Sequence, residues 1–198
     1  MLKMGFLFSI LFFFLNLTID AQVYLVRYQS LTSGSLFHVE TREGEKIGRI
    51  IRERDGGSVH YSFFSFDERL IATGQTERHF SDTIVHIKDP IGIELGWFAA
   101  EIHSVYPNEY KVFNAENRLV SKGYMNWIGS AFFLADPENS KKHLVTYFRP
   151  MFKLFNDYWH FDVHVEGVMD FRLLSIIGVF QTACDLNFEM LDIETLYY

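Results

Sequence analysis

The amino-acid sequence predicts a mainly β protein, in which one closed antiparallel β-barrel surrounds a buried C-terminal α-helix. Three observations lead to this prediction. A unit of two hairpins occurs twice in the chain, and 21 Phe and 10 Tyr residues give an aromatic content typical of strands. A segment near the C-terminus is apolar on all sides at helical periodicity, which is the pattern of a helix buried in a core.

Composition and length indicate a single domain. The chain has 198 residues, of which 48% are hydrophobic and 22% charged, as in ordinary globular proteins. The formal net charge is −7, and Lys141-Lys142 is the only adjacent basic pair. Because nucleic-acid binding by bulk electrostatics needs a basic patch, no nucleic-acid partner is expected. One cysteine, Cys184, allows neither an intramolecular disulfide nor a cysteine zinc cage.

Residues 1–21 have the features of a secretory signal peptide. Lys3 precedes a nearly continuous apolar run over residues 5–17, and Ala21 offers a cleavage point before Gln22. The run is shorter than the roughly 20 residues of a transmembrane helix. We therefore expect an exported protein, secreted or periplasmic, with a single domain over residues 22–198. The alternative is that the uncleaved segment tethers the protein to a membrane.

The repeat consists of residues 61–74, which align without gaps on residues 110–123. Seven positions are shared: Tyr61, Phe64, Asp67, Arg69, Leu70, Ile71 and Gly74 correspond to Tyr110, Phe113, Glu116, Arg118, Leu119, Val120 and Gly123. The preceding segments match as well, with Val39, Gly44, Ile47 and Gly48 corresponding to Ile87, Gly92, Leu95 and Gly96. A period of this length indicates a duplicated supersecondary unit.

Each unit is predicted to contain two hairpins. In the first unit, strands over residues 37–39 and 46–52 flank a turn at residues 41–44, and strands over 59–64 and 70–73 flank a turn at Asp67-Glu68. The glycines are expected at turn positions that need positive φ, and the acids at positions where they bond nearby backbone. The repeated Arg69 and Arg118 are expected to pair with Asp67 and Glu116 and to serve the fold rather than catalysis.

A third, degenerate copy follows. Strands over residues 131–135 and 144–148 flank a turn at residues 136–140, and residues 158–165 form the last strand. The last strand alternates between apolar and polar side chains, so one of its faces is predicted to be dry and the other wet. The core helix is expected over about residues 169–186, with Asp170 near its positive N-terminal end.

The order of these motifs resembles the tubby C-terminal-like superfamily, especially its LURP-one-related and phospholipid scramblase branches. The carrying segments are Asp89-Pro90-Ile91-Gly92-Ile93-Glu94-Leu95-Gly96 and the helix from Asp170 to Asp185, and the similarity spans about residues 36–186. The resemblance implies a barrel of about twelve strands threaded by the C-terminal helix. It also implies an association with membrane lipids, although the basic residues with which tubby domains bind phosphoinositides have no matching positions in this sequence.

The favoured function is a non-catalytic binding or scaffold domain, acting at a lipid membrane surface or with a protein partner. The sequence contains no nucleophile elbow, Walker loop or dinucleotide fingerprint, so neither an enzymatic activity nor a cofactor is expected. A scramblase-like lipid effector is the alternative implied by the resemblance, but the chain lacks the cysteine cluster and terminal span of scramblases.

A metal-dependent hydrolase is the third hypothesis. His160, Asp162 and His164 lie at alternate positions of the last strand and so share one face, where two imidazoles and a carboxylate could bind a divalent metal ion. Same-face neighbours on a strand are roughly 6.5–7 Å apart at Cα, so sharing one ion demands favourable rotamers. The competing interpretation is a solvated polar face.

Overall fold

A computed structural model describes residues 22–31, 34–41, 43–78, 82–101, 109–126, 130–148 and 158–182. The predicted signal peptide, residues 1–21, lies outside these ranges, as do Cys184 and the end of the predicted helix. The strands are β1 (Gln22–Leu31), β2 (Gly34–Thr41), β3 (Lys46–Asp55), β4 (Ser58–Ser65), β5 (Leu70–Arg78), β6 (Asp82–Lys88), β7 (Glu94–Glu101), β8 (Glu109–Asn114), β9 (Leu119–Met125), β10 (Ala131–Ala135), β11 (His143–Phe148) and β12 (Tyr158–Val163).

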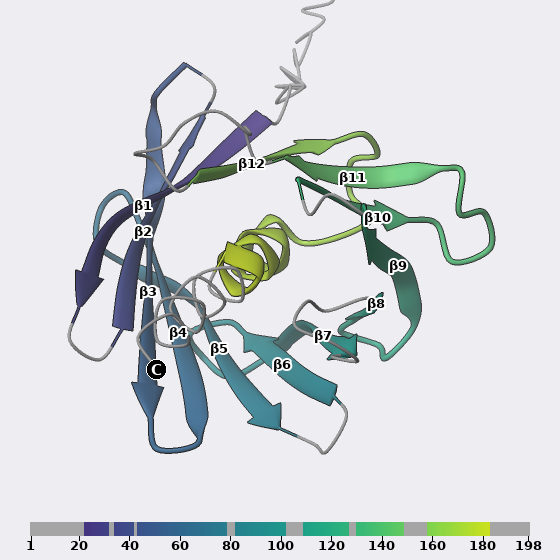
Figure 1. The fold of residues 1–198 in the computed structure, drawn as a ribbon. Helices are drawn as coiled ribbons and strands as arrows, with labels where there is room; N and C mark the ends of the chain where they lie inside the picture. Colours follow the sequence, from purple (N-terminus) through teal and green to yellow (C-terminus); the bar gives the residue numbers. More distant parts are fainter. Residues whose placement is uncertain are drawn as a thin grey trace, which may run out of the picture.

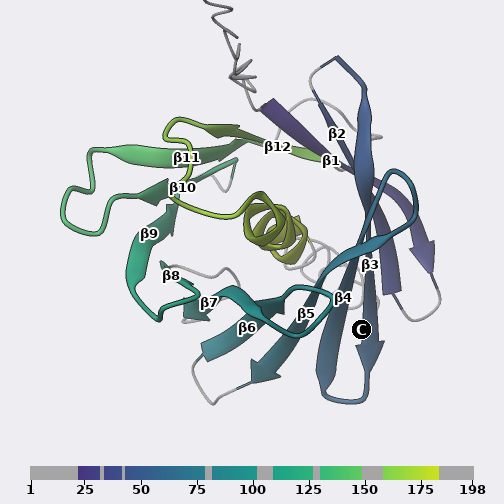
Figure 2. The same cartoon turned by 180° about the vertical axis from the view of Figure 1, so that it is seen from behind.

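The strands form one antiparallel sheet that curls around the C-terminal helix (Figures 1 and 2). Consecutive strands pair from β2 to β12, and β1 pairs with β2 on one side and with β12 on the other. The predicted mainly β architecture with a C-terminal helix is confirmed in the described part of the chain. The hairpins of the repeat and of the third copy are present, whereas β1 had no counterpart among the predicted strands.

Alternation along the strands explains why the sheet curls around a core. In β2, β4 and β6 buried residues alternate with partly exposed ones, which is the period-2 pattern of a sheet with one dry face. The buried face is rich in aromatic side chains, and its largest fully buried members are Trp159, Tyr61, Tyr110, Tyr147, Phe37, Phe63, Phe98, Phe132 and Phe161. The Phe and Tyr residues counted in the sequence therefore supply much of the core.

Four hairpin turns have the same backbone geometry. The first turn residue donates its amide to the carbonyl four positions later and accepts a bond from the amide three positions later. These first residues are Thr41, Ser65, Asp89 and Asn114. The residue three positions later has a positive φ in every case: Gly44 (84°), Glu68 (63°), Gly92 (89°) and Asn117 (60°). The sequence repeat thus corresponds to repeated hairpins.

The glycines of the repeat have three different roles. Gly44 and Gly92 occupy the positive-φ turn position that was predicted. Gly48 lies in β3, where an added Cβ would come within 2.1 Å of the Phe64 carbonyl oxygen, so its requirement is close backbone approach and not a turn. Gly123 makes room for a side chain, because an added Cβ would lie 2.9 Å from Cβ of its cross-strand partner Tyr110.

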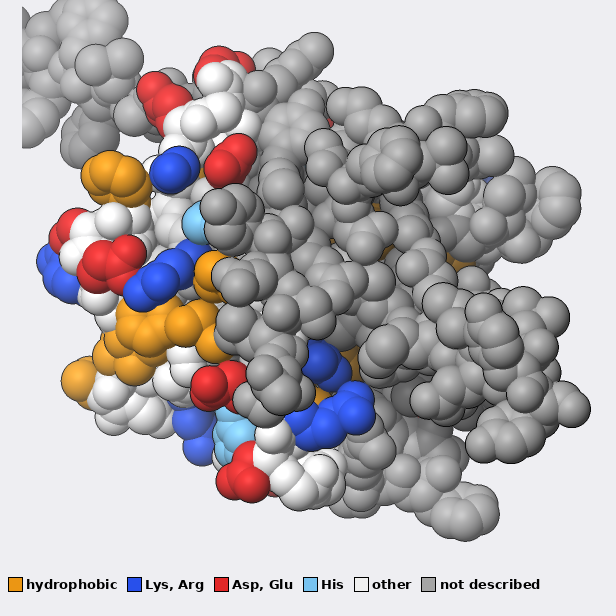
Figure 3. Space-filling model, turned by 60° about the vertical axis from the view of Figure 1, so that its left-hand side comes forward, with side chains coloured by type: hydrophobic (Ala, Val, Ile, Leu, Met, Phe, Trp, Pro, Cys, Tyr) orange, Lys and Arg blue, Asp and Glu red, His pale blue; other side chains and the backbone are white. Residues whose placement is uncertain are grey.

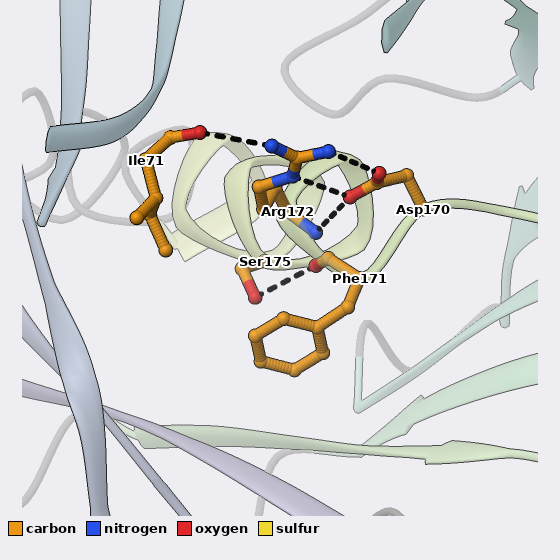
Figure 4. A network of polar contacts seen from close by, with 5 residues as sticks. All are labelled: Ile71, Asp170, Phe171, Arg172 and Ser175. Atoms are coloured by element: carbon orange, nitrogen blue, oxygen red, sulfur yellow. Dashed lines mark hydrogen bonds and ion pairs between the residues drawn. The ribbon is translucent and has the colours of Figure 1, made fainter. Parts of the chain in front are cut away.

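The helix spans residues 171–182, within the predicted range, and begins after Asp170 (Figure 4). The Asp170 carboxylate accepts the backbone N–H of Arg172 (2.8 Å) and binds its guanidinium through two nitrogens, at 3.0 and 2.7 Å. The guanidinium also donates to the Ile71 carbonyl oxygen on β5 (3.1 Å). Burial alone raises the pKa of Asp170, but the Arg172 hydrogen bonds and charge outweigh it, and the net pKa is lowered. This cap joins the helix start to the sheet.

The helix is buried inside the curled sheet, as its all-apolar pattern predicts. Every residue from 173 to 182 is buried, including Ser175, Gln181 and Thr182. The polar groups find partners, since Ser175 and Thr182 donate back to helix carbonyls and the Tyr110 hydroxyl donates to the Gln181 amide oxygen. No helix within the described ranges has the length and apolar character needed to cross a bilayer.

The predicted pairing of turn acids with arginines holds in one copy of the repeat. Arg69 Nε lies 2.5 Å from Asp67 Oδ2, and both side chains are exposed. In the second copy the structure, as far as it describes the chain, has no ion pair between Glu116 and Arg118, and the Arg118 amide instead donates to Asn114 Oδ1 (2.9 Å). The two repeated turns therefore form without a common arginine–acid ion pair.

Candidate binding groove on the outer face of the sheet

The residues of the metal-site hypothesis lie on the outer side of β12 and just beyond its end. The His160 ring stacks on Phe148 of β11, with centroids 5.1 Å apart and planes at 27°. His164 follows the strand, is exposed, and its Nε2 lies 2.8 Å from the Thr146 hydroxyl. Asp162 Oδ1 is buried and has no hydrogen-bond partner.

These contacts do not make a metal centre. Within the described ranges, no group of three or more His, Cys, Asp or Glu side chains is arranged so that it could hold a metal ion. Burial lowers the pKa of His160, and the neighbouring Asp162 carboxylate opposes this change. The hydrolase hypothesis gains no support from this geometry and stays a prediction that metal analysis can test.

A groove with a volume of about 440 Å³ lies on the outer face of β4, β5, β6 and the start of β7. The strand register builds it from two rows of side chains. One row places His60 opposite Gln75 and Gln75 opposite His86. The other row contains Ser62, Thr73, Lys88 and Glu94. Its volume falls in the range of small-ligand and peptide side-chain sites.

The groove carries an incompletely paired carboxylate. Glu94 Oε1 is buried from solvent and accepts no hydrogen bond from the described residues. His86 Nδ1 lies 3.4 Å from it, within ion-pair distance. Glu77, also in the lining, is exposed. Among the described residues, Lys88 is the one cationic side chain of the lining, and it forms no ion pair with the facing Glu94. A buried carboxylate oxygen without a donor costs free energy, which a bound donor would recover.

Stacked aromatic rings continue the first row beyond the groove. His86 stacks on Trp97 of β7, with centroids 5.9 Å apart, and Trp97 stacks on Phe113 of β8 at 3.8 Å with planes at 8°. Trp97 Nε1 donates to Asn117 Oδ1 (2.8 Å), which fixes the indole on the outer face. The His86 wall of the groove is therefore backed by a fixed aromatic platform.

The turn between β6 and β7 lies directly beside the groove and has apolar side chains at its tip. Ile91 is 80% exposed and Ile93 is 59% exposed, while Lys88 and Glu94 at the base of the turn line the groove. Asp89 Oδ1 accepts the amides of Ile91 (3.0 Å) and Ile93 (2.8 Å), so the turn is held in one shape. The neighbouring hairpin turn between β4 and β5 exposes Phe66, at 70%.

The described surface on the β2–β3 side of the molecule mixes charges of both signs. Figure 3 shows Lys and Arg side chains next to Asp and Glu side chains around an apolar patch. Arg49 and Phe64 form a cation–π contact, with the guanidinium carbon 5.4 Å from the ring centroid. Among the described residues, this face has both signs of charge and no exclusively basic field.

Sequence reasoning did not find the groove. Its lining comes from four strands, and which residues face each other depends on register and on bulges at Phe63/Phe64 and Ile87/Lys88. The available signal was alternation in residues 60–62, 73–77 and 86–88, which places His60, Gln75 and His86 on one side of their strands. Only the pairing of those strands brings them together.

Comparison with known proteins supports the fold alone. No family model matches the chain, and no curated protein matches it. The structure is similar to the X-ray structure of the Arabidopsis thaliana protein AT5G01750, a LURP-one-related protein, with a TM-score of 0.55 and 12% sequence identity. The similarity covers 85% of this chain and 93% of that one. This chain therefore shares the overall fold of that protein.

Proposed function

We propose that this protein is a non-catalytic binding domain that holds a segment of a protein partner on its outer face. The contact surface comprises the groove over β4–β7 and the adjoining turn Asp89–Ile93. The main support for this proposal is that a polar groove of about 440 Å³ lies beside the β6–β7 turn, which exposes two isoleucines and is held by the hydrogen bonds of Asp89. Exposed apolar residues beside directed polar groups are typical of protein-binding surfaces.

A protein partner fits this surface better than an anionic membrane does. The exposed apolar tips stand among charges of both signs. Beside Phe66, Asp67 pairs with Arg69 and Glu68 pairs with Arg49. The whole chain has a formal charge of −7. Tips without an excess of basic groups give anionic headgroups no electrostatic attraction, whereas apolar tips with mixed charges suit a protein surface.

Catalysis has less support than binding at this groove. His86 Nδ1 lies 3.4 Å from Glu94 Oε1, but the two atoms form no hydrogen bond. The carboxylate therefore does not orient the imidazole as it would in a catalytic acid–base pair. Among the described contacts, no Ser or Thr hydroxyl of the lining bonds to the ring of His86. The ring is positioned by stacking on Trp97.

A peptide selection tests the proposed function. A random peptide library displayed on phage is selected against the purified protein, and selected peptides are measured by fluorescence anisotropy. Gln75→Trp fills the groove from an exposed position on β5, and Lys122→Trp adds the same side chain to an exposed position on β9. We expect Gln75→Trp to weaken binding by about tenfold or more and Lys122→Trp by less than about twofold.

Vesicle flotation provides the competing outcome. Phosphatidylcholine vesicles with and without phosphatidylserine or phosphoinositide are floated with wild type and with an Ile91→Ser, Ile93→Ser double variant. We expect no flotation of either protein. Flotation that requires the two isoleucines, together with no groove-dependent peptide, would replace the protein-partner proposal with a membrane one.

We also propose that the chain is a tubby-like, LURP-one-related domain whose sheet is a closed barrel of twelve strands. The order of sequence motifs and the fold similarity support this assignment, and the pairing of residues 22–26 of β1 with residues 158–162 of β12 supports closure. Hydrogen exchange tests the seam between those strands. In a closed barrel the bonded amides of both segments exchange as slowly as those of the β3–β4 pair, whereas an open sheet leaves β12 as a fast-exchanging edge.

A further inference from the structure

We infer that the groove over β4–β7 recognises an arginine side chain of the partner, with Glu94 as its main anchor. This inference rests on the proposed function and specifies the chemistry of the bound segment. It rests on three observations: Glu94 Oε1 accepts no hydrogen bond, the lining has more carboxylates than ammonium groups, and stacked rings lie behind the groove wall.

Glu94 Oε1 accepts no hydrogen bond from the described residues, and its ion-pair contact there is His86 Nδ1 at 3.4 Å. Oε1 itself is shielded from solvent, whereas the Glu94 side chain as a whole is 27% exposed. A cation in the groove therefore meets the carboxylate through the exposed part of the side chain, and a rotation of the carboxylate presents Oε1 to it. A hydrogen bond between a charged donor and a carboxylate is among the strongest in proteins, and guanidinium groups offer paired donors that match a carboxylate. A cationic donor therefore satisfies Glu94 better than a neutral one.

The charge of the lining also favours a cation. Among the described residues of the lining, Glu77 and Glu94 contribute two carboxylates and Lys88 contributes one ammonium. Glu77 forms no ion pair in the described residues, so its charge is available to a ligand. Lys88 opposes cation binding, and its removal should strengthen it.

The aromatic row favours arginine over lysine. The His86 ring lines the groove and stacks on Trp97, which in turn stacks on Phe113. A guanidinium is planar and stacks on rings while its edge donates hydrogen bonds, whereas an ammonium is a hydrated point charge. An arginine that reaches Glu94 across the His86 ring uses both features.

A protein segment is a better source of this arginine than a free small molecule. Ile93 is adjacent in sequence to Glu94 and is 59% exposed, and Ile91 extends the apolar tip. A free guanidinium compound would leave both isoleucines in water. A peptide with apolar residues on either side of an arginine covers them and adds buried apolar area.

The test is an NMR titration of the purified protein with three matched peptides. The probe is acetyl-Gly-Ile-Arg-Ile-Gly-amide, and the comparison peptides replace Arg with citrulline, its neutral isostere, or with Lys. We expect the Arg peptide to shift the amide resonances of the groove strands and to bind about tenfold more tightly than the citrulline peptide. The Lys peptide should bind with intermediate affinity.

Three variants separate the site from bulk electrostatics. Glu94→Gln and Glu116→Gln each remove one negative charge, the first in the groove and the second in the exposed turn after β8. We expect Glu94→Gln to weaken Arg-peptide binding by about tenfold and Glu116→Gln by less than about twofold. Lys88→Ala should strengthen binding by about twofold or more.

The outcomes distinguish the inference from the proposed function. Equal losses for the two glutamate variants, equal binding of the Arg and citrulline peptides, or weaker binding by Lys88→Ala would overturn the arginine assignment. If display-selected peptides that lack basic residues still bind in a way that Gln75→Trp blocks, the groove is a binding site and only the arginine is wrong. If no peptide binds in a groove-dependent way, both proposals fail.

Discussion

The Tyr147 hydroxyl on β11 donates a hydrogen bond of 2.9 Å to the carbonyl oxygen of Leu174 in the buried helix. Tyr147 is fully buried, and burial raises the pKa of its hydroxyl well above the ordinary value, so the group stays a neutral donor. The bond ties the sheet to the helix at a site closed to water.

Tyr147→Phe should destabilise the protein by about 1–2 kcal/mol, because it removes a buried hydrogen bond without changing the packing of the ring. Urea unfolding followed by circular dichroism gives the free energy of unfolding. The control is Tyr124→Phe, since Tyr124 is 38% exposed and bonds to His143 at the surface. The control should cost less than about 0.5 kcal/mol, and an equal cost for both variants would contradict a special role for the Tyr147 bond.

Gly123→Ala should destabilise the protein by about 1–3 kcal/mol through overpacking. The added Cβ would lie 2.7 Å from Phe132 Cε2 and 2.9 Å from Tyr110 Cβ in the core. Gly57→Ala is the matched control, because nothing lies within 4 Å of its added Cβ. Chemical denaturation of both variants checks the difference, and a tolerated alanine at Gly123 would show that the core yields around this position.

Gly92→Ala measures the cost in stability of a positive φ at a non-glycine residue, separately from any steric overlap of the added Cβ. Its added Cβ also meets nothing within 4 Å, but Gly92 has φ of +89°, whereas no such φ occurs at Gly57. We expect a loss of about 1 kcal/mol at Gly92 and none at Gly57, measured as unfolding free energies. Equal stabilities of the two alanine variants would mean that the turn relaxes to negative φ without cost.

The stability of the protein should depend on the Asp170 carboxyl at acidic pH. The folded-state pKa is below the reference value of 3.8, so the unfolded chain takes up this proton first as the pH falls. The stabilisation is complete above pH 3.8 and is lost as the pH falls through the lowered folded-state pKa. Asp170→Asn should flatten this part of the curve of unfolding free energy against pH, and an unchanged curve in this variant would contradict the prediction.

The signal-peptide and metal hypotheses each have a direct measurement. Export of the expressed chain followed by N-terminal sequencing should give a mature protein that begins at Gln22, and an exported chain that retains residues 1–21 would indicate the tether instead.

Elemental analysis of the purified, folded protein should show no stoichiometric metal, because His160 and His164 have other neighbours. A bound metal that is lost in His160→Ala and Asp162→Ala would revive the hydrolase hypothesis.

The sequence by itself determined the hairpin strands, their turns and the buried helix, but not β1, because each of the predicted elements depends on local periodicity or on the repeat. Alternation marks a half-buried strand within a few residues, and the helix at 171–182 is apolar on every side, so burial is its only stable environment. The duplication preserved Tyr61 with Gly74 and Tyr110 with Gly123, and both pairs are direct cross-strand neighbours. In each pair the tyrosine side chain packs over a position that has no Cβ, and this relation depends on strand pairing, which the sequence alone did not give.

The candidate site was decided by the tertiary structure alone. His60, Gln75, His86 and Trp97 are far apart in the chain, and each looks like an ordinary outward residue of its own strand. Register and bulges place them in one row, because a shift of one residue in any strand would send its side chain to the other face. The polar alternation of β12 was visible in the sequence, but whether His160, Asp162 and His164 converge depends on side-chain neighbours from other strands, which local pattern does not specify.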